Sequence, residues 1–324
     1  MADAVGAGQI TAPATLGTEQ ARRSRATPTD QSSGAQRRID GPRSGPLVRL
    51  LRPRQWIKNG FVLAPLIFSG EFVKPAAVIQ ALIAFALFCV ASSATYVVND
   101  LRDREADAAH PVKSRKRPLA SGEVKPPAAI ALVAVLYAIV LAAFAWSPPT
   151  AGVAVAYIVL NLAYSLRLKH IPVIDIFCLA AGFVLRVYGG ALAIDVPLST
   201  WMMVTTLSLA LYLAAIKRRD ELATSGDASR SVLQFYTLRL LDRYSETAAL
   251  SAIMFYGLFV VTVRPKLNVT IPFVLFGLFR YWYIVETGGR GESPTDAVWT
   301  DPPLIVTVIL WAAVVVWRLK QAGA

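Results

Sequence analysis

Long apolar runs recur along this 324-residue chain, and they restrict what it can fold into more than any other feature. Each run is close to the roughly 20 residues that a helix needs to cross the hydrocarbon core of a bilayer. We therefore predict an all-α, polytopic membrane protein with nine spans. The expected spans are 48–69, 76–100, 127–146, 150–166, 172–194, 200–216, 246–263, 271–285 and 302–318.

Composition separates this prediction from the alternative of a soluble protein with very apolar helices. Hydrophobic residues make up 55% of the chain and charged residues only 17%, and the mean hydropathy is +0.49. Soluble domains contain about a quarter charged residues. The balance therefore favours lipid as the surrounding solvent.

Lysine and arginine are concentrated in alternate loops, which predicts the orientation of the chain in the membrane. Basic residues are retained on the cytoplasmic side of membrane proteins. The N-terminus is therefore expected in the cytoplasm and the C-terminus outside. The net charge of +12 follows from this bias and from contact with anionic lipid headgroups, so we expect no nucleic-acid partner. The basic loops are 1–47, 101–126, 167–171, 217–245 and 286–301.

Residues 1–45 differ in composition from the rest of the chain. They are rich in Ala, Gly, Ser, Thr and Arg and contain no apolar stretch, which predicts a disordered, basic cytoplasmic tail. Residues 46–324 would form a single membrane domain. Its cytoplasmic loops 101–126 and 217–245 are long, and long loops in compact domains are usually functional.

An acidic cluster opens the first of these long loops. Asn99, Asp103 and Asp107 have i, i+4 and i+8 spacing, and Asp100 would share their helix face. Carboxylates this close repel one another, and Mg²⁺ prefers such oxygen ligands and bridges them to substrate phosphates. The alternative is a solvated polar face that is paired with neighbouring arginines. We favour a magnesium site because acidic residues at a membrane boundary are costly to retain without a use.

A mixed cluster opens the second long loop. Asp220 and Glu221 lie three and four residues after Lys217, so a cation and two carboxylates would share one helix face. Together with Arg218 it offers phosphate ligands and groups that can hold a metal or sugar hydroxyls. The alternative is a basic anchor of the positive-inside kind.

Other polar residues lie in or beside the expected spans. Lys58 lies deeper in the first span than an interfacial anchor requires, and a polar segment from Tyr164 to Lys169 begins at the end of the fourth span. Asp175 and Arg186 are intramembrane ions, which should face the bundle interior and have partners. Whether they contact substrate or only stabilise the bundle stays open. The glycines 182, 189 and 190 around Arg186 predict close contact with another helix.

Two of these motifs together resemble the UbiA superfamily of intramembrane prenyltransferases. They are N-D-x-x-D-x-x-x-D at 99–107 and Y-S-x-x-L-K at 164–169, and the resemblance covers about residues 45–320. It implies a nine-helix bundle with two cap loops over a central cytoplasmic cavity. The sequence departs from the aromatic prenyltransferase members at 217–221, where they have a second Asp-rich motif.

Four further segments are similar to one branch of this superfamily. They are 52–59, 217–221, 279–281 and 301–303. The branch transfers phosphoribose from 5-phosphoribosyl 1-diphosphate to a polyprenyl phosphate at the plasma membrane, for the synthesis of arabinan and arabinogalactan in cell walls. A basic second cluster suits this donor, which carries a 5-phosphate as well as a diphosphate. Homo-oligomer formation stays open. The alternatives are a UbiA-type enzyme that prenylates an aromatic acceptor from an isoprenyl diphosphate, and a transporter with a central polar cavity.

The resemblance assigns roles to the candidate residues. Mg²⁺, or Mn²⁺ in its place, would offset the charge of the leaving diphosphate, and catalysis would rest on positioning and charge stabilisation. The metal ligands would be Asn99, Asp100, Asp103 and Asp107, and the catalytic residues Asp100, Asp103, Asp107 and Lys217. The donor would be bound by Lys58, Lys217, Arg218 and Glu221, and the lipid phosphate by Tyr164, Arg167, Lys169 and Arg186.

Overall fold

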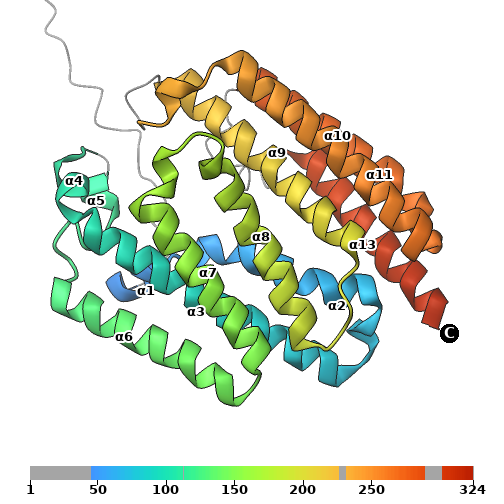
Figure 1. The fold of residues 1–324 in the computed structure, drawn as a ribbon, viewed down its shortest axis with the longest axis horizontal. Helices are drawn as coiled ribbons and strands as arrows, with labels where there is room; N and C mark the ends of the chain where they lie inside the picture. The colour runs from blue at the N-terminus through green and yellow to red at the C-terminus, as the bar shows by residue number, and fades with distance from the viewer. Residues whose placement is uncertain (1–44, 112, 226–230, 289–300, 324) are drawn as a thin grey trace, which may run out of the picture. The chain divides into compact units, whose positions relative to one another are not determined.

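The computed structural model describes residues 45–111, 113–225, 231–288 and 301–323, and every regular element within these ranges is an α-helix or a 3₁₀-helix (Figure 1). Apart from residue 45, the predicted tail lies outside the described residues. So does most of the loop predicted at 286–301.

Eight helices in the described part of the chain are long and apolar enough to cross a membrane, which confirms the polytopic all-α prediction. Several of them begin with proline. Proline has no backbone N–H, and in the first turn of a helix that group would have no intrahelical partner. The eight are α3 (Pro75–Arg102), α6 (Pro126–Ala142), α7 (Pro148–Leu166), α8 (Ile174–Ala193), α9 (Thr200–Ser225), α10 (Leu238–Val263), α11 (Ile271–Gly288) and α13 (Pro302–Gly323).

The first expected span, 48–69, is wrong as a continuous helix. It consists of α1 (Pro46–Leu51), the 3₁₀-helix η1 (Pro53–Leu63) and α2 (Ala64–Ser69). Arg52 adopts a left-handed conformation, with φ of 55°, and ends α1. Pro53 disfavours a helical conformation at the residue before it. A 3₁₀ segment of 11 residues is unusually long, so its tertiary contacts, more than its local sequence, must stabilise it.

Two glycines on α8 allow close contacts, Gly190 with η1 and Gly189 with α3. A Cβ added at Gly190 would lie 1.9 Å from the backbone oxygen of Val62, and one at Gly189 would lie 2.5 Å from the ring of Phe88 on α3. Only glycine allows backbones to approach this closely. The predicted small-residue face on α8 is therefore confirmed, and its neighbours are η1 and α3.

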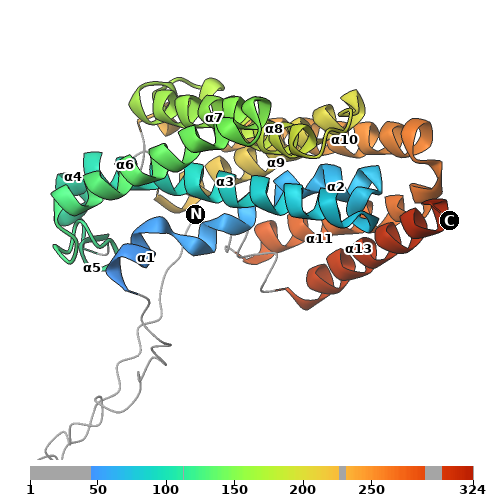
Figure 2. The ribbon, with the colours of Figure 1, turned by 90° about the horizontal axis from the view of Figure 1, so that it is seen from below.

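The long helices pack in chain order apart from α3, which lies between α6 and α7. Contacts link α6 to α3, α3 to α7, α7 to α8, α8 to α9, α9 to α10, α10 to α11, and α11 to α13 (Figures 1 and 2). Short 3₁₀-helices join several of them. These are η2 (Glu71–Val73), η3 (Ala143–Ala145), η4 (Leu168–His170), η6 (Leu233–Phe235) and η7 (Pro265–Thr270).

The loop predicted at 101–126 contains two short helices, α4 (Arg104–Ala109) and α5 (Lys113–Lys116), which lie together at one end of α3 (Figure 1). Leu119 and Val124 pack with Leu50 of α1 and Val97 of α3, which fixes the loop against the bundle. The loop predicted at 217–245 is shorter than expected, because α9 continues to Ser225. The mixed cluster 217–221 therefore lies within α9.

Candidate active site

The acidic segment lies where α3 ends and α4 begins. Asp103 separates the two helices, with φ of −87° and ψ of 7°. The helical register nevertheless continues through it. The Asp103 amide donates to the Asn99 carbonyl at 2.9 Å, and the Asp107 amide donates to the Asp103 carbonyl at 2.8 Å. The i, i+4 spacing predicted from the sequence is therefore preserved across the interruption.

Two of the four predicted metal ligands converge on one arginine. Asp100 and Asp107 are only 2% and 3% exposed. The Nη1 atom of Arg117 lies 3.1 Å from Asp100 Oδ1 and also contacts Asp107 Oδ2. Arg52 Nη2 pairs with Asp100 Oδ1, and Lys113 Nζ lies 3.6 Å from Asp107 Oδ1. Positive charge thus already lies between these carboxylates.

This arrangement suits a divalent cation in part. Carboxylate and amide oxygens are appropriate Mg²⁺ ligands, and Mg²⁺ usually uses one or two protein carboxylates and completes its shell with water and phosphate oxygens. Within the described ranges, no three Asp, Glu, His or Cys side chains come together as a ready metal site. Asp100 and Asp107 could therefore hold an ion that substrate oxygens also coordinate, provided that Arg117 moves aside.

The cluster 217–221 is divided between two faces of α9. Arg218 and Glu221 form one ion pair at 2.6 Å. Arg219, about 100° further around the helix, pairs instead with Asp242 of α10 at 2.5 Å and with Glu286 of α11 at 2.8 Å. The two neighbouring arginines consequently have different roles, which their adjacency in the sequence did not indicate.

Arg218 is fully buried, with an exposure of 1%, and its side chain has three hydrogen-bond partners. Its Nε donates to Asp175 Oδ2 at 2.7 Å, its Nη1 to Glu221 Oε2 at 2.6 Å, and its Nη2 to the Tyr164 hydroxyl at 2.9 Å. Two carboxylates already balance its charge. Arg218 therefore lies in the interior, where it bonds Glu221 and Tyr164. The phosphate-binding role predicted for Arg218 would require these contacts to break.

Asp175 has no exposed surface, and each of its two oxygens has its own partner. Oδ2 accepts from Arg218, and Oδ1 accepts from the Tyr236 hydroxyl at 2.7 Å. The same hydroxyl accepts from the Val173 amide at 2.6 Å, and Val173 has a φ of 69°. Burial and the bond to Asp175 raise the pKa of Tyr236 above its usual value, so it stays a donor. Tyr236 was not predicted from the sequence, because it lies in a predicted loop without a motif.

Arg186 is also buried, but its hydrogen-bond partners are neutral. Its Nε donates to Asn59 Oδ1 at 2.8 Å, its Nη1 to the Gly182 carbonyl at 2.9 Å, and its Nη2 to the Tyr157 hydroxyl at 2.8 Å. The guanidinium also lies over the rings of Tyr157 and Phe183. The prediction that Asp175 and Arg186 face the interior and have partners is confirmed. Arg186 holds η1, so its predicted contact with lipid phosphate stays a prediction.

Two hydrogen bonds connect the predicted clusters through the end of α7. Arg102, beside the acidic segment, donates to the Ser165 carbonyl at 2.6 Å, and the adjacent Tyr164 accepts from Arg218 of α9. The segment 164–169 therefore lies between the acidic segment and the α9 cluster. Arg167 is exposed and Lys169 is half-buried.

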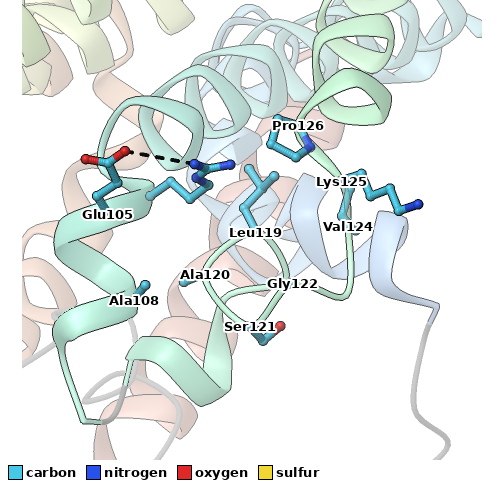
Figure 3. Close-up of a pocket in the computed structure, with 10 residues that line it drawn as sticks. Glu105, Ala108, Leu119, Ala120, Ser121, Gly122, Val124, Lys125 and Pro126 are labelled. Atoms are coloured by element: carbon cyan, nitrogen blue, oxygen red, sulfur yellow. Dashed lines mark ion pairs between the residues drawn. The ribbon is translucent and has the colours of Figure 1, made fainter.

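A cavity of about 390 Å³ lies beside the acidic segment, between α4 and the loop that leads to α6 (Figure 3). Arg104 and Glu105 form an ion pair on one wall, and Leu119 and Lys125 lie on the other. A second cavity, of about 220 Å³, lies beside Arg264. Neither is lined by a predicted metal or substrate residue, so the charge contacts identify the candidate site.

Comparison with known proteins gives consistent results. The model of the UbiA prenyltransferase family matches residues 61–294. The decaprenyl-phosphate phosphoribosyltransferase of Mycolicibacterium smegmatis is 34% identical over 82% of this chain and 89% of its own length. The protein of the same name from Mycobacterium tuberculosis H37Rv is 35% identical over 83% of this chain and 92% of its own length.

Among solved structures, the fold is similar to a UbiA homolog from Archaeoglobus fulgidus bound to GPP and Mg²⁺. The TM-score is 0.65, and the match covers 85% of this chain and all of that one, at 20% identity. At that identity the similarity shows the fold alone.

Proposed function

This chain belongs to the UbiA prenyltransferase family, and from that premise we propose that it transfers 5-phosphoribose from 5-phosphoribosyl 1-diphosphate to decaprenyl phosphate. The bond between the anomeric carbon and the diphosphate breaks, a bond to an oxygen of the lipid phosphate forms, and diphosphate leaves. The main support is the match to phosphoribosyltransferases, which extends over about four fifths of this chain and most of theirs.

The charges of the candidate site support a donor with two phosphate-bearing ends. Arg52, Lys113 and Arg117 surround the acidic segment. The predicted donor ligands Lys58 and Lys217 are half-buried residues, which would add two further positive charges. Arginine and lysine are the usual ligands of phosphate groups.

Asn99, Asp100, Asp103 and Asp107 would hold Mg²⁺, with Mn²⁺ as a substitute. When bound, the ion would offset the charge of the leaving diphosphate. The guanidinium of Arg117 between Asp100 and Asp107 marks this position as favourable for positive charge.

The other residues would orient the two substrates. Lys58 and Lys217 would bind phosphate oxygens of the donor, and Glu221, which Arg218 holds, would accept hydrogen bonds from ribose hydroxyls. Lys169 and Arg167 would bind the lipid phosphate. That phosphate is already an anion and needs no strong base, so catalysis rests on positioning and charge stabilisation.

The chain is a multi-pass membrane protein. Its distribution of lysine and arginine supports a cytoplasmic N-terminus and a cytoplasmic active site in the plasma membrane, with the C-terminus outside. A water-soluble donor would enter from the cytoplasm, and the lipid acceptor from the bilayer.

Labelled donor and membranes that contain the protein test this proposal. Label should enter the lipid extract when decaprenyl phosphate is present. Lys217→Ala should raise the donor KM by roughly 10- to 150-fold, the value of a lost charge-assisted hydrogen bond, and should change the acceptor KM little. Lys266→Ala is a matched control, because Lys266 lies outside the candidate site and contacts only the backbone of Gln321 in the described bonds. A wild-type protein that ignores this donor and consumes an isoprenyl diphosphate would refute the proposal.

A further inference from the structure

Asp175 pairs with Arg218, which in turn bonds Glu221 and Tyr164, although Asp175 has no exposed surface of its own to offer a substrate. We infer that it is a positioning residue, which acts through Arg218 to set the orientation of Glu221 and Tyr164. This inference rests on the proposed function, since it assigns a purpose to the α9 cluster in donor recognition.

The geometry of Arg218 determines what the site can present to a substrate. Three of its nitrogens point to three partners on different elements: Asp175 on α8, Tyr164 on α7 and Glu221 one turn further along α9. Asp175 and Glu221 together carry two negative charges against its one positive charge. The guanidinium already makes these three contacts, and its planar, rigid fork fixes Glu221 and Tyr164.

Asp175 is itself fixed from the other side. The Tyr236 hydroxyl bonds Oδ1 of Asp175 and accepts from the Val173 amide. Tyr236 follows η6, so the segment that precedes α10 is tied to the start of α8 by one hydroxyl. The chain Tyr236, Asp175, Arg218, Glu221 consequently runs from a loop, through the buried interior, to a side chain that is 19% exposed.

The chemistry requires a carboxylate at position 175. Both of its oxygens accept, one from a guanidinium and one from a hydroxyl. An asparagine has one oxygen and one NH₂ group. The NH₂ would then face either the Arg218 Nε–H, which is also a donor, or a hydroxyl that already accepts from Val173. In either orientation one bond of the chain from Tyr236 to Arg218 is lost or weakened, so Glu221 should be held less firmly even if the fold survives.

Two variants test the inference by steady-state kinetics with both substrates. Tyr236→Phe removes two hydrogen bonds, the one to Asp175 Oδ1 and the one from the Val173 amide, of which only the first bears on Arg218. Asp175 stays paired with Arg218, so no buried charge is left unpaired and the variant should fold. We expect its donor KM to rise about 2- to 12-fold, which corresponds to one ordinary hydrogen bond, and its acceptor KM to stay within twofold. Asp175→Asn should raise the donor KM at least about tenfold, because the bond that it weakens is charged.

Tyr256→Phe is the matched control. The Tyr256 hydroxyl is also buried and lies 2.7 Å from Thr270 Oγ1, but it belongs to the packing around η7. This variant should lose thermal stability as Tyr236→Phe does, without a change in either KM. A donor that lacks the 2-hydroxyl of ribose adds a second readout, because Tyr236→Phe should affect its KM less.

The outcomes separate the two claims. If the wild-type protein transfers no phosphoribosyl group, the proposed function fails and the inference with it. If it transfers the group but Tyr236→Phe lowers thermal stability and leaves the donor KM unchanged, only the inference is overturned. Should Asp175→Asn fail to fold, Tyr236→Phe alone decides between these results.

Discussion

The close approach of α8 and η1 leads to a direct prediction for Gly190→Ala. A methyl group at this position would lie 1.9 Å from the Val62 carbonyl oxygen, whereas ordinary contacts begin at 3.4 Å. The two backbones would therefore have to separate by about 1.5 Å, the difference between these distances. Backbone atoms cannot rotate out of the way as a flexible side chain can.

The expected loss follows from two opposing effects. Overpacking of this kind destabilises by about 1–3 kcal/mol, and separation of η1 from α8 also strains the bond from Arg186 Nε to Asn59 Oδ1. Replacement of a helical glycine by alanine returns about 0.5–1 kcal/mol. The overpacking cost less this return is at most about 2.5 kcal/mol, and the strained Arg186 bond adds to it. We expect a net loss of about 1–2.5 kcal/mol, which corresponds to a fall in Tm of roughly 2–10 °C for a domain of this size.

Thermal unfolding of the purified protein in detergent measures this loss, and transfer activity measures its consequence for Lys58 on η1. Gly257→Ala is the control, because nothing lies within 4 Å of a Cβ at Gly257 on α10. It should leave Tm unchanged or raise it. A Gly190→Ala protein with the Tm of the wild type would refute the argument that this contact needs glycine.

Three further predictions test other parts of the molecule. Asp103→Ala should abolish transfer at saturating Mg²⁺ with little change in Tm; a rate near that of the wild type would exclude Asp103 from the metal site. Removal of residues 1–44 should leave the specific activity in detergent nearly intact, whereas a well-folded but inactive truncation would show that the tail contributes to the site. Arg280 lowers the pKa of Asp301 through a hydrogen bond, so this pair stabilises the fold above the unfolded pKa of about 4 and stops doing so as the pH falls through the lowered value. The difference in Tm between wild type and Asp301→Asn should thus be present at pH 7 and decrease as the pH falls below about 4, and a difference that does not change in acid would contradict the assignment.

Hydropathy predicted most of the fold because an apolar run of about 20 residues in a bilayer can satisfy its backbone hydrogen bonds only as a helix or in a closed barrel. Eight of the nine expected spans are long helices in the described part of the chain. The first failed because hydropathy measures only how apolar a segment is. Pro53 and the left-handed Arg52 break the helix there, and contact with Gly190 on α8 stabilises the resulting 3₁₀ geometry.

The candidate site was predicted less completely, since spacing along a helix does not identify the partner of each face. The sequence indicated that Asp100 and Asp107 would lie together, and both do contact Arg117. It could not show that Arg218 and Arg219 point to different helices. Nor could it identify Tyr236, because that contact is made between residues 61 positions apart in the chain.

The contact between η1 and α8 also has a consequence for biosynthesis. Asn59 bonds Arg186, which is synthesised 127 residues later. Short helical pieces are marginal in isolation, so the first membrane segment cannot reach its final conformation while it is the only part of the protein in the bilayer. Lys58 and the start of the candidate site would complete their packing only after α8 has been inserted. Ribosome-bound chains that end before α8 should therefore leave residues near 59 open to chemical labelling, and longer chains should protect them.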